Sequence, residues 1–196
     1  MSEFIISAHA MCRQSPIDAS LCAQDSQVVI EDKTHTTRVG VRGVAAESFL
    51  KRQGMIVPDQ PNQAEYSENG LIVLRLSRTE FWLIDVAQSH QAALEALERQ
   101  ALSEEGVYRL YCQHSHALFE LKGEYSAEMF AKLCGVDLSH GAFAAQSIAQ
   151  TSVARVNAIV VNTSLSAQRS DNYLILSDVS SAEHLWDALL DASQEF

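Results

Sequence analysis

The sequence predicts an α+β fold made of two pseudo-repeated split β-α-β units, and two recurring patterns lead to this prediction. In residues 39–43 and again in residues 119–123, an alternating strand pattern ends at a glycine and is followed by apolar residues at helical spacing. A second similarity comes later in each copy, where residues 78–84 resemble residues 169–175 and again precede a helical pattern. Repetition of this kind indicates that one chain contains two copies of a structural unit.

Composition limits the classes of protein to be considered. The chain has 196 residues, of which 47% are hydrophobic, so it can bury a core as one compact domain. Its net charge of −11 and its scattered lysines and arginines argue against a nucleic-acid partner. No apolar run approaches the roughly 18 to 20 residues that cross a membrane, and the N-terminus lacks the features of a signal peptide. We therefore expect a cytoplasmic protein with no membrane partner, whose four cysteines are reduced.

The first copy follows an N-terminal segment that has no counterpart in the repeat. We interpret residues 1–34 as an N-terminal arm with a possible strand at residues 28–30, and residues 35–196 as a single compact domain. Within the first copy, about residues 35–113, the pattern predicts these elements in order: a strand at 36–42, a helix at 44–53, a polar loop, strands at 71–76 and 80–86, a helix at 89–102 and a strand at 107–112.

The second copy, about residues 114–196, repeats this order. After the strand that ends at Gly123 and the helix that follows it, strands are expected near residues 148–156, 158–162 and 172–177. The terminal helix is marked by a capping box at Ser180 and Glu183 and by an apolar stripe that comprises Ala182, Leu185, Trp186, Leu189 and Ala192. Two split β-α-β units with helices on the faces of their sheets accommodate this order of elements.

The second copy also contains a series of short motifs: Asp137 and Leu138, Ala142 and Phe143, then Ala149, Gln150 and Thr151, and the Leu185 and Trp186 pair of the last helix. This series resembles the gamma subunit of heterotetrameric sarcosine oxidase, and the resemblance covers residues 36–194. More distantly, the region from Glu31 onward resembles the folate-binding aminomethyltransferase fold of the glycine cleavage T-protein. That likeness rests on Asp32, His35, Val41, Gly43 and the strand at residues 71–73.

The resemblance implies both a fold and a role. The fold is that of the folate-binding aminomethyltransferases. The role is that of a non-catalytic gamma subunit, with alpha, beta and delta subunits as partners. The complex converts sarcosine to glycine, hydrogen peroxide and 5,10-methylenetetrahydrofolate. The resemblance implies tetrahydrofolate, FAD, FMN and NAD for the complex and no cofactor in this chain. The alternative is a stand-alone folate-binding or regulatory protein of one-carbon metabolism.

One departure from the T-protein pattern bears on catalysis. The T-protein places an aspartate, which assists proton movement at the folate, immediately before the strand at residues 71–73. Here Gly70 occupies that position and Asn69 precedes it. A glycine side chain offers no general base. The departure therefore argues against autonomous aminomethyl transfer.

The candidate binding residues are Gln150, Thr151 and Arg155. A guanidinium in an apolar strand must pair with an acid or face a partner. If the unit keeps a vestigial folate or anion pocket, we expect it at these three residues. An exposed arginine on an edge strand explains the same residue equally well. We also expect the N-terminal arm and the edge near Arg155 to contact the larger subunits, because the arm is apolar but too short for a core of its own.

A metal site is the remaining chemical hypothesis. Cys112, His114 and His116 alternate in the sequence, so on a strand they would share one face, which suits zinc but also a half-exposed polar strand. A fourth ligand is lacking, and we expect no metal. An enzyme that uses this face is a third hypothesis for the function. The sequence has no glycine-rich nucleotide loop, so it predicts no dinucleotide or nucleoside triphosphate site.

Overall fold

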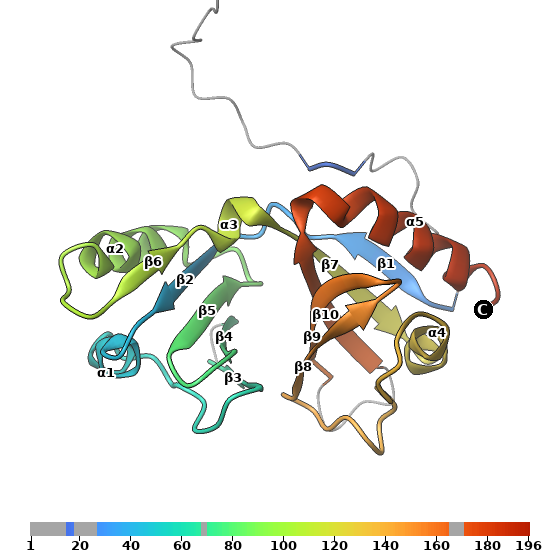
Figure 1. The fold of residues 1–196 in the computed structure, drawn as a ribbon, viewed down its shortest axis with the longest axis horizontal. Coiled ribbons are helices and arrows are strands. Elements are labelled where there is room, and N and C mark those ends of the chain that lie inside the picture. Colours follow the sequence, from blue (N-terminus) through green and yellow to red (C-terminus); the bar gives the residue numbers. More distant parts are fainter. Residues whose placement is uncertain (1–14, 18–26, 68–69, 165–170) are drawn as a thin grey trace, which may run out of the picture.

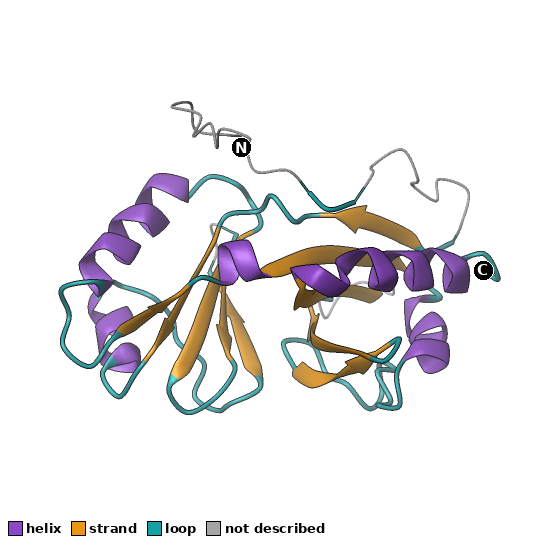
Figure 2. Cartoon of the chain, turned by 45° about the horizontal axis from the view of Figure 1, so that its top comes forward, coloured by secondary structure: helices purple, strands orange, loops and turns teal. Residues whose placement is uncertain are grey.

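Two antiparallel sheets of five strands face each other, and helices cover their outer faces (Figures 1 and 2). This architecture is seen in a computed structural model that describes residues 15–17, 27–67, 70–164 and 171–196. Asn69 and the first two residues of the repeat at 169–175 lie outside the described residues. The resulting order of layers is helix, sheet, sheet, helix, as an α+β fold of two similar halves requires.

The first sheet belongs to the first copy of the repeat. Its strands lie in the order β3 (Gln63–Tyr66), β4 (Leu71–Arg75), β5 (Glu80–Asp85), β2 (Arg38–Arg42) and β6 (Tyr108–Leu110). Helices α1 (Ala46–Arg52) and α2 (Gln91–Ala101) pack on its outer face. Phe49, Leu50, Leu94 and Leu97 of these helices are buried against Val39, Val41, Phe81 and Leu83 of the sheet. These are the positions at which helical and strand spacing predict apolar faces.

The second sheet has the same arrangement. Its strands lie in the order β8 (Ile148–Val153), β9 (Val156–Asn162), β10 (Asp171–Asp178), β7 (His116–Gly123) and β1 (Val29–Asp32). Helices α4 (Ser126–Leu133) and α5 (Ala182–Ser193) cover its outer face, and a short helix, α3 (Cys112–Ser115), connects the two halves. The apolar stripe predicted for the terminal helix is confirmed, because all five of its residues are buried in the second core.

The fifth strand of each sheet comes from a different part of the chain. In the first sheet β6 follows α2 and pairs with β2, whereas in the second sheet the equivalent position beside β7 is taken by β1, which precedes the whole repeat. Val28 and Ile30 are fully buried in the second core, and Ile17 is buried there as well. The boundary that we predicted at residue 34 therefore needs correction. The described parts of the expected arm, residues 15–17 and 27–34, pack against the chain itself.

The two glycines of the repeat, Gly43 and Gly123, are required for the same physical reasons. Gly43 and Gly123 have φ angles of 142° and 140°. A Cβ atom at Gly43 would lie 2.0 Å from the carbonyl oxygen of Gly106, and one at Gly123 would lie 2.1 Å from that of Gln27. In both halves the backbone that enters the fifth strand passes over the glycine. Each position therefore requires glycine for two reasons: its φ angle is positive, and a neighbouring backbone segment leaves no room for a Cβ atom.

The pairing of the strands shows that the sequence match between residues 78–84 and 169–175 is misaligned by one residue. Val39 of β2 faces Leu83, and Phe119 of β7 faces Ile175. Leu83 therefore corresponds to Ile175, whereas the match between the two sequences had aligned it with Leu174. Since side chains alternate between the faces of a strand, the sequence match would have put every side chain of β10 on the wrong face.

Three local predictions also differ from the structure. Strand β3 lies in the segment that we expected to be a polar loop. Cys112–Ser115 is a helix, whereas the metal hypothesis requires Cys112, His114 and His116 to lie along one strand. The capping box at Ser180 and Glu183 is absent: the Asp178 side chain accepts a hydrogen bond from the Ser180 backbone N–H at 2.9 Å and caps a short 3₁₀ turn instead. Tertiary packing decides such short segments, in which propensity is a weak guide.

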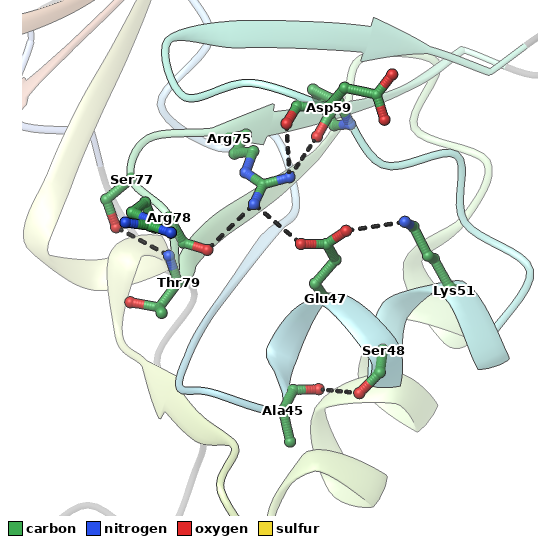
Figure 3. A network of polar contacts seen from close by, with 10 residues as sticks. Ala45, Glu47, Ser48, Lys51, Asp59, Arg75, Ser77, Arg78 and Thr79 are labelled. Carbon is green, nitrogen blue, oxygen red and sulfur yellow. Dashed lines mark hydrogen bonds and ion pairs between the residues drawn. The ribbon is translucent and has the colours of Figure 1, made fainter.

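The buried side chain of Arg75 links α1 to two loops of the first half (Figure 3). Arg75 at the end of β4 donates to the carbonyl oxygens of Pro58 and Asp59 at 2.8 and 3.2 Å. Its other terminal nitrogen contacts Glu47 of α1 at 2.9 Å and the carbonyl oxygen of Arg78 at 3.3 Å. Both terminal nitrogens are thus bound, whereas Nε has no partner within the described residues, and the bonds that are made offset the cost of burying the charge. Arg75 thereby fixes α1 to the loop before β3 and to the β4–β5 turn.

The two sheets are tied together at one edge. The backbone N–H of Ala64 donates to the carbonyl oxygen of Gln146 at 2.8 Å, and that of Ile148 donates to the carbonyl oxygen of Asn62 at 2.9 Å. Together with an antiparallel bridge between Gln63 and Ser147, these bonds join the start of β3 to the start of β8. Apolar side chains from both sheets fill the space between them: Ile72, Leu74, Trp82, Ile84, Leu118, Val161, Leu174 and Leu176.

Candidate functional site

A cavity of about 550 Å³ opens between the two sheets, on the side where β7 and β10 face β4. Ile72, Val86 and Leu174 supply an apolar part of its wall, and Tyr66, Thr163 and Asn172 supply polar groups. The segment from Gln27 to Val29 closes one side. A volume of this size and a largely apolar wall with a few convergent polar groups are typical of small-molecule sites.

Three polar atoms in this wall have no hydrogen-bond partner within the described residues. They are the hydroxyl oxygens of Tyr66 and Thr163 and the Oδ1 atom of Asn172. Thr163 is only 9% exposed, and burial raises the pKa of the Tyr66 hydroxyl well above its usual range. The two hydroxyls are neighbours but do not form a hydrogen bond of normal geometry. Because buried polar groups are nearly always paired, these atoms indicate a position for a ligand.

A network of charges borders the same cavity. Glu120 is 9% exposed and contacts Lys122 at 2.9 Å and Lys33 at 3.7 Å, and Lys122 also contacts Glu31 at 3.1 Å. Burial by itself would lower the pKa of Lys122, but its bonds to the two carboxylates raise it. The Nδ2 group of Asn172 donates to Glu120 at 3.3 Å, which fixes the orientation of the amide and leaves Oδ1 without a partner within the described residues.

Gly70 immediately precedes β4, on the same face of the strand as Ile72 in the cavity wall. Its φ is 86°, and a Cβ atom there would lie 2.6 Å from the Cβ atom of Ala87. An aspartate at this position would strain the backbone and collide with Ala87. Only glycine fits without strain at this position, where the T-protein has an aspartate. The carboxylate that does line the cavity, that of Glu120, is bound by Lys122 and Lys33.

The three residues predicted from the sequence do not line this cavity, and Arg155 lines a different hollow from Gln150 and Thr151. Gln150 donates from Nε2 to Asn62 Oδ1 at 2.7 Å and to the carbonyl oxygen of Leu76 at 2.6 Å, so it ties the halves together. With Thr151 it lines a hollow of about 300 Å³ on another side of the space between the sheets. Arg155 lies at the β8–β9 turn and lines a separate groove.

The geometry at Cys112 does not favour a zinc site. Cys112 is buried in α3, and burial raises the pKa of its thiol to about 12, which leaves it protonated. The ring of His116 packs against Trp82 with centroids 4.8 Å apart, and its Nδ1 contacts the Ser115 hydroxyl at 2.8 Å. Across the part of the chain that the structure describes, no group of three or more histidine, cysteine or acidic side chains could hold a metal.

Comparison with known proteins agrees with this fold. The model of the GCVT N-terminal domain family matches residues 11–196. The chain belongs to this family. A chain in the solved structure of the heterotetrameric sarcosine oxidase of Corynebacterium sp. U-96, in complex with pyrrole 2-carboxylate, matches at 25% identity and a TM-score of 0.74. The match covers 86% of the present chain and 85% of that one, so the two are of similar length. The GCVT-type fold predicted from the sequence is therefore confirmed.

Two further comparisons add no functional information. The regulatory subunit of aspartate kinase from Thermus thermophilus matches with 18% identity over 84% of this chain and 96% of that one, but its TM-score of 0.36 is too low to support an argument. No curated protein sequence matches this GCVT-domain chain.

None of the helices in the described residues is long and apolar enough to cross a membrane.

Proposed function

We propose that this chain is a non-catalytic, gamma-type subunit of a cytoplasmic complex of the sarcosine oxidase type. The observation that supports this most directly is the match to a chain of similar length in a heterotetrameric sarcosine oxidase. The reaction of the complex is the oxidative demethylation of sarcosine to glycine, hydrogen peroxide and 5,10-methylenetetrahydrofolate. The partners are alpha, beta and delta subunits, which carry FAD, FMN and NAD.

Two residues of the cavity region, Gly70 and Glu120, support a non-catalytic role. Gly70 occupies the position of the T-protein aspartate, and the packing of Ala87 leaves no room for a longer side chain there. Glu120 is held between Lys33 and Lys122. Both contacts occupy the Glu120 carboxylate, which a general base would have to present to its substrate at hydrogen-bond distance.

Co-expression tests this proposal. The chain purified alone should be colourless and inactive on sarcosine, and it should co-purify in a stoichiometric complex with flavin-bearing subunits encoded in the same genome. A flavin spectrum in the isolated chain would contradict the assignment of the cofactors to other subunits. Failure of the wild-type chain to associate with any such subunit would refute the proposed function.

The cavity favours a second candidate, a stand-alone folate-binding or regulatory protein. Its volume of about 550 Å³ and its unpaired groups on Tyr66, Thr163 and Asn172 suit a heterocycle that carries both hydrogen-bond donors and acceptors, such as the head group of a folate. Calorimetric titration with folinic acid, a chemically stable folate, separates the candidates. Binding to the isolated chain without any associated subunit would favour the second one.

A further inference from the structure

The β8–β9 hairpin has an unusual turn. Val153 and Val156 form the last pair of the ladder, so Ala154 and Arg155 make a two-residue loop. Both residues have positive φ angles, 49° and 67°. Turns of this kind favour asparagine and glycine, because a side chain at positive φ is strained. Neither residue of the present turn is of the favoured type.

Contacts from two helices hold this strained turn in place. The backbone N–H of Ala154 donates to the carbonyl oxygen of Leu133 at the end of α4, at 2.8 Å. The carbonyl oxygen of Ala154 accepts a hydrogen bond from Nε2 of His184 in α5, at 3.1 Å. Val153, the residue before the turn, is fully buried. Strain that the surroundings enforce in this way is often found at binding sites.

The turn presents Arg155 in a basic groove. Arg155, Lys132 and His184 come from three different elements and line a groove of about 590 Å³ whose lining contains no acidic residue. The Lys132 ammonium is already bound by Glu195 and lies 4.6 Å from the centre of the Phe196 ring. Arg155 is exposed, and its guanidinium makes no ion pair or hydrogen bond within the described residues.

We propose that the Ala154–Arg155 turn is a docking site for an acidic segment of a partner subunit, in which a carboxylate binds the Arg155 guanidinium. The inference rests on the proposed function and names the partner chemistry at one surface. The chain as a whole carries a net charge of −11, which repels acidic segments elsewhere. The groove is a local exception, and a guanidinium offers a carboxylate a bidentate geometry that a lysine does not.

Two other exposed arginines serve as controls in a test of this proposal. Arg78 and Arg99 are also exposed and also lack ion pairs within the described residues, but they lie in the first half of the chain. The affinity of the purified chain for the co-expressed flavin-bearing subunits is measured by biolayer interferometry at low and high salt. Arg155→Glu should weaken binding by about tenfold or more and reduce its salt dependence, and Arg155→Lys should weaken it less. Arg78→Glu and Arg99→Glu should change it by less than about twofold, as exposed charges usually do.

A glycine variant separates binding from folding. Arg155→Gly relieves the strain at the turn, so it should raise the melting temperature of the isolated chain by about 2–4 °C. The same variant should weaken the complex as Arg155→Glu does. A variant that is more stable yet binds less tightly cannot be explained by misfolding. Unchanged affinity of Arg155→Glu would overturn the docking site and leave the proposed function standing, whereas the absence of any complex with the wild-type chain would overturn both.

Discussion

Removal of the unpaired hydroxyls in the cavity should stabilise the chain. Tyr66→Phe and Thr163→Val each remove a buried hydroxyl that has no partner within the described residues, and neither change leaves a large void. A buried polar group without a partner costs about 1–3 kcal/mol, and the neighbouring hydroxyls favour the lower value. A gain of about 1 kcal/mol raises the melting temperature of a chain of this size by about 2–4 °C. The double variant should therefore melt about 4–8 °C higher.

Thermal unfolding followed by circular dichroism measures this gain, and folinic acid titration measures its functional cost. Under the second candidate function, in which these hydroxyls bond the ligand, each variant should bind folinic acid about tenfold more weakly. Ser177→Ala is a matched control. The Ser177 hydroxyl is also buried and unpaired, but it does not line the cavity, so its removal should stabilise the chain without changing binding. Lower melting temperatures for both cavity variants would show that the hydroxyls are paired in solution and would refute the reasoning.

Three further predictions concern stability. Gly123→Ala should destabilise the chain by at least about 2 kcal/mol and speed up the hydrogen exchange of the backbone amides in β1. Gly135→Ala is the control: a Cβ atom there meets nothing within 4 Å, so this change should be neutral or slightly stabilising. Glu47→Gln should cost about 1–2 kcal/mol in urea unfolding, because Arg75 loses its carboxylate, although Glu47 is partly exposed. Burial alone would raise the pKa of Asp85, but the His90 side chain and neighbouring backbone N–H groups lower it. Its stabilisation is thus present above the unfolded pKa and lost as the pH falls through the folded pKa, so Asp85→Asn should flatten the acid limb of the stability curve between about pH 5 and pH 2.

The repeat and most of its elements could be predicted from the sequence. Apolar residues at a period of two or of 3.6 reflect burial on one face, and the strands and helices that carry such faces were predicted near their observed places. The repeat was visible at Gly43 and Gly123 because no other residue tolerates their conformation and the close approach of another backbone segment. The identity of residue 70, a glycine, was likewise enough to exclude the T-protein aspartate, because a missing carboxyl group is a property of the sequence alone.

The tertiary structure decided where the candidate site lies. Tyr66, Thr163 and Asn172 come from separate segments, and no spacing in the sequence relates them. Their significance depends on three atoms that lack partners, which is a property of distances across the two sheets. The motif residues Gln150 and Arg155 were conspicuous in the sequence, yet one ties the halves together and the other lies at an exposed turn.

The place of β1 was also decided only by the fold. Residues 27–34 share no pattern with the repeat, and the sequence alone suggested that they lie outside the domain. They complete the second sheet by pairing with β7, in the place that β6 takes beside β2 in the first sheet. Local periodicity records which side of a segment is buried. It does not record which distant segment provides the partner, because strand pairing is fixed by hydrogen bonds and packing between parts of the chain far apart in sequence.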